Sequence, residues 1–239
     1  MIYLDLKMAS KAQKLKPKRT GKSVIRVTEI FYSIQGEGLH IGLPTVFIRT
    51  AGCNLSCSWC DTAYARDFED SKNMAVSDIV EEVRKYPCKL VCITGGEPLI
   101  QKLSVRTLMR KLLKLNYSID IETNGSISLN TLPRTKKLFI SMDLKCPSSK
   151  MDQKMIFSNL RLLKSTDQLK FVIANLEDYD YAKNIIARYH PVCNIILMPV
   201  YRHGIELKLL AAHMLKDSLK ARVLIQMHKI IWGEKRRGV

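Results

Sequence analysis

The chain repeats one pattern along most of its length, a short apolar run followed by a longer amphipathic stretch. Strands are predicted where apolar residues run together or alternate with polar ones, over residues 24–34, 44–50, 89–94, 119–123, 138–144, 169–174, 194–200 and 222–227. Helices are predicted where apolar residues recur every three or four positions, over residues 76–86, 104–115, 155–164, 177–189 and 206–219. Such alternation indicates parallel strands with helices on the outside.

About six of these strand–helix units are present, fewer than the eight that close a full barrel. We therefore predict an α/β fold with a partial, open TIM-like barrel. In such folds the chemistry sits in loops at the carboxyl ends of the strands. The cysteine-rich loop after residue 50, the turn Gly95-Gly96-Glu97-Pro98 and the segment Glu122-Thr123-Asn124-Gly125 all occupy such positions. We expect these three segments to lie together at one mouth, the open end of the barrel where the strands end.

The charge is concentrated at the start of the chain. Residues 7–22 carry seven Lys or Arg and no acid, and the whole chain has a net charge of +17. We predict a basic, flexible arm over residues 1–22 and a single domain over residues 23–239. Such a charge attracts anions, but no basic residues alternate with aromatic ones, so nucleic acid is not an expected partner. With no apolar run of about twenty residues and no secretory signal, we expect a cytoplasmic protein without a membrane contact.

Three of the seven cysteines, Cys53, Cys57 and Cys60, fall within eight residues. Thiolates of this kind hold Fe–S clusters. Three of them bind three corners of a 4Fe-4S cube and leave the fourth iron open to a small molecule. The alternative is a zinc site that recruits a distant ligand, Cys146 or a histidine. The other cysteines, Cys88, Cys92 and Cys193, lie in or beside apolar runs and are expected to be buried.

The spacing Cys-x-x-x-Cys-x-x-Cys, together with the Gly-Gly-Glu-Pro turn after the next strand, resembles the radical S-adenosylmethionine (SAM) superfamily. The resemblance implies a radical SAM core, in which the open iron binds SAM and one electron releases a 5′-deoxyadenosyl radical. It also implies a set of cofactor-binding residues, namely Trp59, Cys60, Asp61, Gly96, Glu97, Asp143, Leu144 and Lys145. Only Lys145 in the last three matches the Ser-Pro-Lys tripeptide that many relatives carry.

Further motifs resemble one family within that superfamily, the 7-carboxy-7-deazaguanine synthases. These motifs are Gln35-Gly36-Glu37-Gly38, Arg49, Cys60-Asp61-Thr62, Asp143 to Ser149 and Gln226-Met227-His228-Lys229, and the likeness runs from about Ile25 to Trp232. The family converts 6-carboxy-5,6,7,8-tetrahydropterin into 7-carboxy-7-deazaguanine with loss of ammonia, on the way to queuosine and archaeosine. The resemblance implies a homodimeric lyase that uses the cluster, SAM and Mg²⁺.

The same resemblance assigns the substrate residues, which are Ile34, Gln35, Gly36, Arg49 and Thr94. Arg49 would pair with the pterin carboxylate, since a guanidinium binds a carboxylate in a bidentate fashion. Thr62 would supply an oxygen to Mg²⁺. His228 fits either a substrate contact or a structural role. Separately from the resemblance, the charge of the basic arm suggests an electron donor with an acidic face, such as a flavodoxin or ferredoxin.

Two other functions remain open at this point. A glycyl-radical activating enzyme would share the cysteine spacing and the Gly-Gly-Glu-Pro turn, but not Gln35, Arg49 and Thr62. A zinc-containing RNA-binding protein would account for the charge but would leave the Gly-Gly-Glu-Pro turn unexplained.

Overall fold

One sheet of nine strands runs through the computed structural model, which describes residues 23–234, 237 and 238. The predicted arm over residues 1–22 lies outside these residues. The strands are β1 (Val24–Ile34), β2 (Pro44–Thr50), β3 (Lys72–Ala75), β4 (Leu90–Gly95), β5 (Ser118–Thr123), β6 (Leu138–Asp143), β7 (Gln168–Ile173), β8 (Asn194–Pro199) and β9 (Arg222–Val223). Their order in the sheet is β3-β1-β2-β4-β5-β6-β7-β8-β9. From β2 to β9 all neighbours are parallel, and β1 and β3 extend this sheet in antiparallel pairing.

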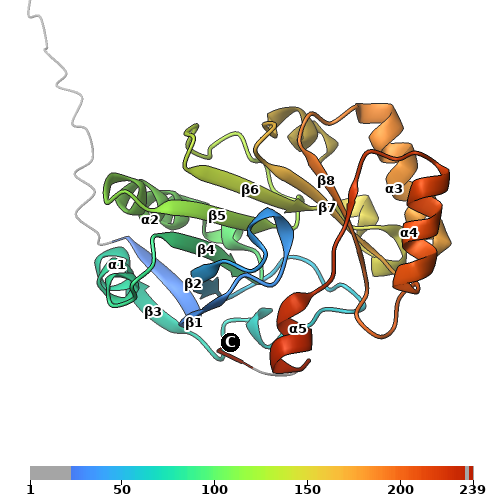
Figure 1. Ribbon diagram of the computed structural model, residues 1–239. Helices are drawn as coiled ribbons and strands as arrows, with labels where there is room; N and C mark the ends of the chain where they lie inside the picture. The colour runs from blue at the N-terminus through green and yellow to red at the C-terminus, as the bar shows by residue number, and fades with distance from the viewer. Residues whose placement is uncertain (1–22, 235–236, 239) are drawn as a thin grey trace, which may run out of the picture.

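The helices pack outside this curved sheet, with α1 and α2 at one flank and α3 and α4 at the other (Figure 1). They are α1 (Val76–Arg84), α2 (Lys102–Lys114), α3 (Leu176–Tyr189), α4 (Leu207–Lys216) and the short α5 (Met227–Trp232). In α2 the apolar side chains recur every three or four residues, so that Val105, Leu108, Met109 and Leu112 are fully buried. Burying each such side chain stabilises the fold by about 1.5–3 kcal/mol.

The sheet is not closed into a barrel, because β3 and β9 are its two edges. The chain after β9 crosses the open side. Leu224 N donates to Leu197 O in β8 at 3.0 Å, and Met227 N donates to Gly36 O just beyond β1 at 3.0 Å. The prediction of a partial, open barrel is thus confirmed, and α5 covers the gap that the missing strands leave.

Two predicted elements are wrong. Residues 155–164 form no α-helix; a 3₁₀ helix covers Phe157–Leu162. The side chain of Asn159 explains this, since it donates to Gly125 O and Ile127 O and accepts from Leu129 N, tying the segment to the neighbouring loop. The last strand ends at Val223 rather than at residue 227, because Gln226 turns inward to bond Glu37.

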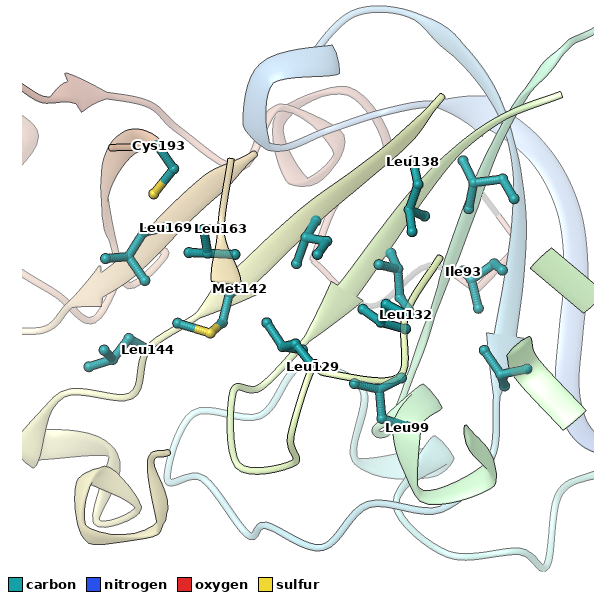
Figure 2. Close-up of a cluster of buried hydrophobic side chains, with 14 of the residues drawn as sticks. Ile93, Leu99, Leu129, Leu132, Leu138, Met142, Leu144, Leu163, Leu169 and Cys193 are labelled. Carbon is teal, nitrogen blue, oxygen red and sulfur yellow. The ribbon is translucent and has the colours of Figure 1, made fainter. Parts of the chain in front are cut away.

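A continuous apolar core fills the space between the sheet and the helices, and Figure 2 shows part of it around Ile93, Leu138 and Leu169. Cys92 and Cys193 are buried, as predicted, whereas Cys88 is only half-buried. Cys146 is also completely buried, although its turn is polar. It is therefore a packed side chain of the apolar core.

Candidate functional site

A cavity of about 590 Å³ opens at the carboxyl ends of the parallel strands. Its wall includes Cys53 from the loop after β2, Gly96 from the loop after β4 and Asn124 from the loop after β5. The predicted meeting of these loops at one mouth is therefore confirmed. The volume is in the range of sites that enclose small molecules.

The cysteine loop is held by backbone hydrogen bonds to two other loops. Cys53 N donates to Arg66 O at 2.8 Å, and Ser58 N donates to Ser149 O at 3.3 Å. Cys53, Cys57 and Cys60 all line the cavity, the first two half-buried and the third exposed. Burial raises the pKa of the Cys53 and Cys57 thiols.

This donor set fits an Fe–S cluster, in which each thiolate binds a different iron. Among the described residues no three His, Cys, Asp or Glu side chains converge on a point as ligands of a single metal ion. Cys146, one of the two kinds of fourth ligand that the zinc alternative offered, does not line the cavity, whereas His203 and His228 do.

The glycine turn after β4 packs directly against the cysteine loop. Gly96 N donates to Thr50 O and Glu97 N donates to Gly52 O, at 3.1 and 2.7 Å. A Cβ atom on Gly96 would lie 2.1 Å from Gly52 O, so only glycine fits there. The turn therefore fixes the backbone immediately before Cys53.

Glu97 is fully buried and does not line the cavity. Its carboxylate accepts hydrogen bonds from Leu99 N, Thr123 Oγ1 and Asn124 N, at 2.6 to 3.0 Å. Burial raises its pKa to about 7, against the opposing effect of these donors. The carboxylate thus joins the loops after β4 and β5, and its predicted contact with SAM stays a prediction.

One end of the cavity carries Arg49, which the sheet register places opposite Thr94. Arg49 Nε donates to Glu29 Oε1 at 2.6 Å, and Tyr64 Oη donates to the same oxygen at 2.8 Å. The pKa of Arg49 is raised, since Tyr64 and Glu29 outweigh the opposing effect of burial. Among the described residues the two terminal nitrogens of Arg49 carry no hydrogen bond, so a ligand carboxylate can bind them.

Glu122 connects two of the predicted substrate residues, and it begins the segment Glu122-Thr123-Asn124-Gly125 that was expected at this opening without a stated role for the carboxylate. Its carboxylate accepts from Thr94 Oγ1 at 2.6 Å and from Gln35 Nε2 at 3.4 Å. This side chain lines the cavity between them. The signal available was its position, since Glu122 and Asp120 are two residues apart in β5 and share one face of the strand.

The opposite end of the cavity carries charged residues from β6 and β7. Lys145 Nζ lies 2.8 Å from Asp143 Oδ2, and Lys170 Nζ lies 3.5 Å from the same oxygen. The second oxygen of Asp143 is buried and has no hydrogen-bond partner among the described residues. It is free to accept from a bound ligand.

The structure brings most of the predicted site residues to this one cavity wall. Those that line it are Ile34, Gln35, Gly36, Arg49, Cys53, Cys57, Trp59, Cys60, Asp61, Thr62, Thr94, Gly96, Asp143 and Lys145. Glu97 and Leu144 do not, and Leu144 belongs to the apolar core. His228 lines the cavity, and so do several unpredicted residues, namely Glu37, Tyr64, Glu122, Lys170, Gln226 and Lys229.

Comparison with known proteins gives a consistent result. The model of the Radical SAM superfamily matches residues 47–190. A 7-carboxy-7-deazaguanine synthase from Methanospirillum hungatei is 43% identical over 212 residues, which cover 87% of this chain and 86% of that protein. One from Thermoplasma acidophilum is 38% identical over 87% of this chain and 97% of its own length.

Among solved structures, the crystal structure of QueE from Escherichia coli superposes with a TM-score of 0.71. The match covers 86% of this chain and 95% of that one at 22% sequence identity. At this identity the likeness establishes the fold, an open radical SAM barrel, and the sequence matches carry the family.

Proposed function

The chain belongs to the 7-carboxy-7-deazaguanine synthases of the radical SAM superfamily, and we propose that its cavity binds the pterin beside Arg49 and SAM beside the cysteines. As a member of this family it is a carbon–nitrogen lyase. It converts 6-carboxy-5,6,7,8-tetrahydropterin into 7-carboxy-7-deazaguanine with loss of ammonia, as part of deazapurine synthesis. The family membership speaks against both the activating enzyme and the zinc protein.

One observation carries the proposal: three thiols and an arginine with free terminal nitrogens line the same cavity. Cys53, Cys57 and Cys60 would hold a 4Fe-4S cluster. When bound, the cluster and SAM supply the one-electron chemistry that removes hydrogen from the substrate. The residues of the chain bind, orient and shield the reactants.

Each end of the cavity has a defined task in this proposal. Arg49 holds the pterin carboxylate, because its Nε is already fixed by Glu29 and its terminal nitrogens carry no hydrogen bond among the described residues. Glu122 holds Gln35 and Thr94 in position for the ring. Fixing the reacting atoms in this way is what lowers the barrier.

We also propose that Thr62 contributes a hydroxyl oxygen to Mg²⁺. Thr62 Oγ1 lies 3.9 Å from Cys60 Sγ and lines the cavity, which supports a metal between the cluster loop and the substrate. A hard cation such as Mg²⁺ prefers oxygen ligands and retains waters and substrate oxygens.

The test of the function uses anaerobically reconstituted protein with SAM, Mg²⁺, dithionite and the carboxytetrahydropterin. Formation of 7-carboxy-7-deazaguanine, followed by mass, is the expected result. Formation of 5′-deoxyadenosine without that product would mean that the radical machinery works on another substrate. Absence of both from protein with a full cluster would refute the proposal.

For the electron donor we propose an acidic redox protein such as a flavodoxin or ferredoxin. Helix α2 carries Lys102, Arg106, Arg110 and Lys114 at four-residue intervals and no acid. Like charges at this spacing destabilise a helix by about 0.2–0.5 kcal/mol for each pair. The stability of α2 therefore does not explain these four basic residues. Its first turn adjoins the cysteine loop, since Gln101 Nε2 donates to Ala51 O at 3.1 Å.

The donor proposal is tested by the rate of cluster reduction. Changing Lys102 and Arg106 to Glu should slow reduction by flavodoxin several-fold, while reduction by dithionite stays unchanged. Changing Lys208 and Lys220 to Glu is the matched control on another face. Deleting the residues before Gly21 tests whether the basic arm contributes. Equal rates for all variants would refute the docking role of α2.

We further propose that the chain forms a homodimer. Helix α4 presents Leu207, Leu209 and Leu215 to solvent, and apolar side chains gathered on one helix favour an interface. Sedimentation of the wild-type chain should give twice the mass of one chain, and Leu207→Lys with Leu215→Lys should shift it toward the monomer.

No helix among the described residues is long and apolar enough to cross a bilayer.

A further inference from the structure

A lysine lies inside the barrel in the middle of an apolar strand. Lys170 of β7 is only 8% exposed, and its neighbours Leu169 and Phe171 are fully buried on the other face of the sheet. Removing an ammonium group from water without a partner costs several kcal/mol. Lys170 therefore needs anionic partners, and their positions indicate what it does.

Lys170 joins two carboxylates from different parts of the chain. Its Nζ lies 2.6 Å from Glu37 Oε2, in the loop after β1, and 3.5 Å from Asp143 Oδ2, at the end of β6. Asp143 in turn lies 2.8 Å from Lys145 Nζ. Glu37, Lys170, Asp143 and Lys145 thus form a row of alternating charges, which we call the charge row.

The charge row runs along the cavity wall from Glu37, next to the predicted substrate residues, to Lys145, a predicted SAM-binding residue. All four residues line the cavity wall. Glu37 follows the predicted substrate residues Gln35 and Gly36, and its other oxygen accepts from Gln226 Nε2 at 2.7 Å. At the far end, Lys145 lines the same cavity as Cys57.

We propose that Lys170 is a positioning residue that holds the Glu37 carboxylate in the substrate end and fixes its distance from the Asp143–Lys145 pair in the cofactor end. This inference rests on the proposed function, since it takes the pterin and SAM as the two occupants. Glu37 would then be a charged acceptor for N–H groups of the pterin ring. Lys170 itself touches neither reactant and acts through its two partners.

The electrostatics of the row agree with this geometry. Burial by itself would raise the pKa of Glu37, but Lys170 and His228 lower it well below its ordinary value. Burial opposes the charge of Lys170, yet Glu37, Asp143 and Glu122 raise the pKa of Lys170 well above its ordinary value. Each charge of the row is therefore stable only while its neighbours are present.

A double-mutant cycle on the reconstituted enzyme tests whether Lys170 acts through Glu37. We expect Lys170→Met and Glu37→Gln each to weaken pterin binding by at least tenfold. The double variant should bind no more weakly than the weaker single variant, because both changes remove the same contact. If the two losses multiply in the double variant, Lys170 acts independently of Glu37 and the proposal is wrong.

The apoprotein provides a second readout that needs no ligand. Lys170→Met leaves the buried Glu37 carboxylate without its lysine and Asp143 with Lys145 alone, so the melting temperature should fall by roughly 10 °C. Adding Glu37→Gln should restore part of this loss, because the uncompensated charge of Glu37 disappears. A double variant that melts below Lys170→Met would overturn the charge row.

Two controls separate positioning from general stability. Lys183→Met removes an ion pair with Asp217 at 2.9 Å on the surface and should leave both affinities unchanged. Lys170→Arg keeps the charge and so should fold, but its larger head displaces Glu37 and should weaken pterin binding several-fold while SAM binding is kept. Wild-type pterin affinity in either Lys170 variant would overturn the proposal.

Failure of the proposed function is distinguishable from failure of this inference. A wild-type enzyme that binds SAM but not the pterin would refute the assigned substrate. The melting temperatures of the apoprotein would then decide the charge row, supporting it if the double variant recovers stability and overturning it if no recovery occurs.

Discussion

A single methyl group added at Gly96 should disturb the cysteine loop. The Cβ of Gly96→Ala would lie 2.1 Å from Gly52 O and 2.8 Å from Ala65 O, where ordinary contact begins at 3.4 Å. Both contacts are backbone atoms, so no side chain can rotate away. The loop before Cys53 must move by roughly 1 Å, and overpacking of this kind costs about 3 kcal/mol. For a chain of this size we expect the melting temperature to fall by about 6–12 °C.

The assay is thermal unfolding of the apoprotein, followed by the iron content after reconstitution. Gly96→Ala should lower both the melting temperature and the amount of cluster. Gly42→Ala is the control, since no atom lies within 4 Å of its Cβ position and only its φ of +88° is unfavourable. We expect the control to lose about 1–2 kcal/mol of its free energy of unfolding and to keep its full cluster content. A Gly96→Ala protein with wild-type stability and iron content would refute the packing argument.

Three further predictions follow from the site and the barrel interior. Cys57→Ala should abolish the cluster and turnover together, and a variant that turns over without iron would contradict the ligand assignment. Arg49→Lys should raise the KM for the pterin by roughly 10–100-fold with a smaller effect on SAM affinity, because an ammonium group cannot form a bidentate pair with a carboxylate. An unchanged KM would exclude a contact between Arg49 and the pterin carboxylate. Asp120 accepts a hydrogen bond from His40 at 2.7 Å and thereby raises the His40 pKa above its ordinary value of 6.5. This pair stabilises the fold below pH 6.5, and its contribution is lost as the pH rises through the higher pKa of the folded state. Asp120→Asn should therefore lower the melting temperature more at pH 5.5 than at pH 8.5. Equal losses at both pH values would contradict the charged pair.

Most of the strands were predictable because each has a strong local signal, whereas the short β3 and α5 were not predicted. The predicted bounds of residues 44–50 match β2, and most other boundaries moved by one or two residues. Two errors fall where a side chain has a tertiary partner: Asn159 binds a neighbouring loop and prevents a helix, and Gln226 turns toward Glu37 and ends a strand. Such partners lie far away in the sequence, so no local pattern reveals them.

The candidate site likewise has a part that the sequence predicts and a part that depends on tertiary contacts. Cys53, Cys57 and Cys60 are close in sequence, and their spacing together with the Gly-Gly-Glu-Pro turn predicts a cluster at that loop. The parallel order of the strands also predicts that the loops after β2, β4 and β5 share one mouth. The sequence alone therefore determined the fold class, the cluster loop and the family resemblance.

Only the tertiary structure decided which buried charges belong to the site. Lys170 in the sequence is one polar residue in an apolar strand, and nothing local indicates that Glu37, 133 positions away, is its partner. The crossing of the C-terminal segment over the open side of the barrel, which brings His228 against Gly36, is equally invisible in the chain. Both depend on the curvature of the sheet and on side chains that meet only after folding, because a buried charge finds its counter-charge in space and not along the sequence.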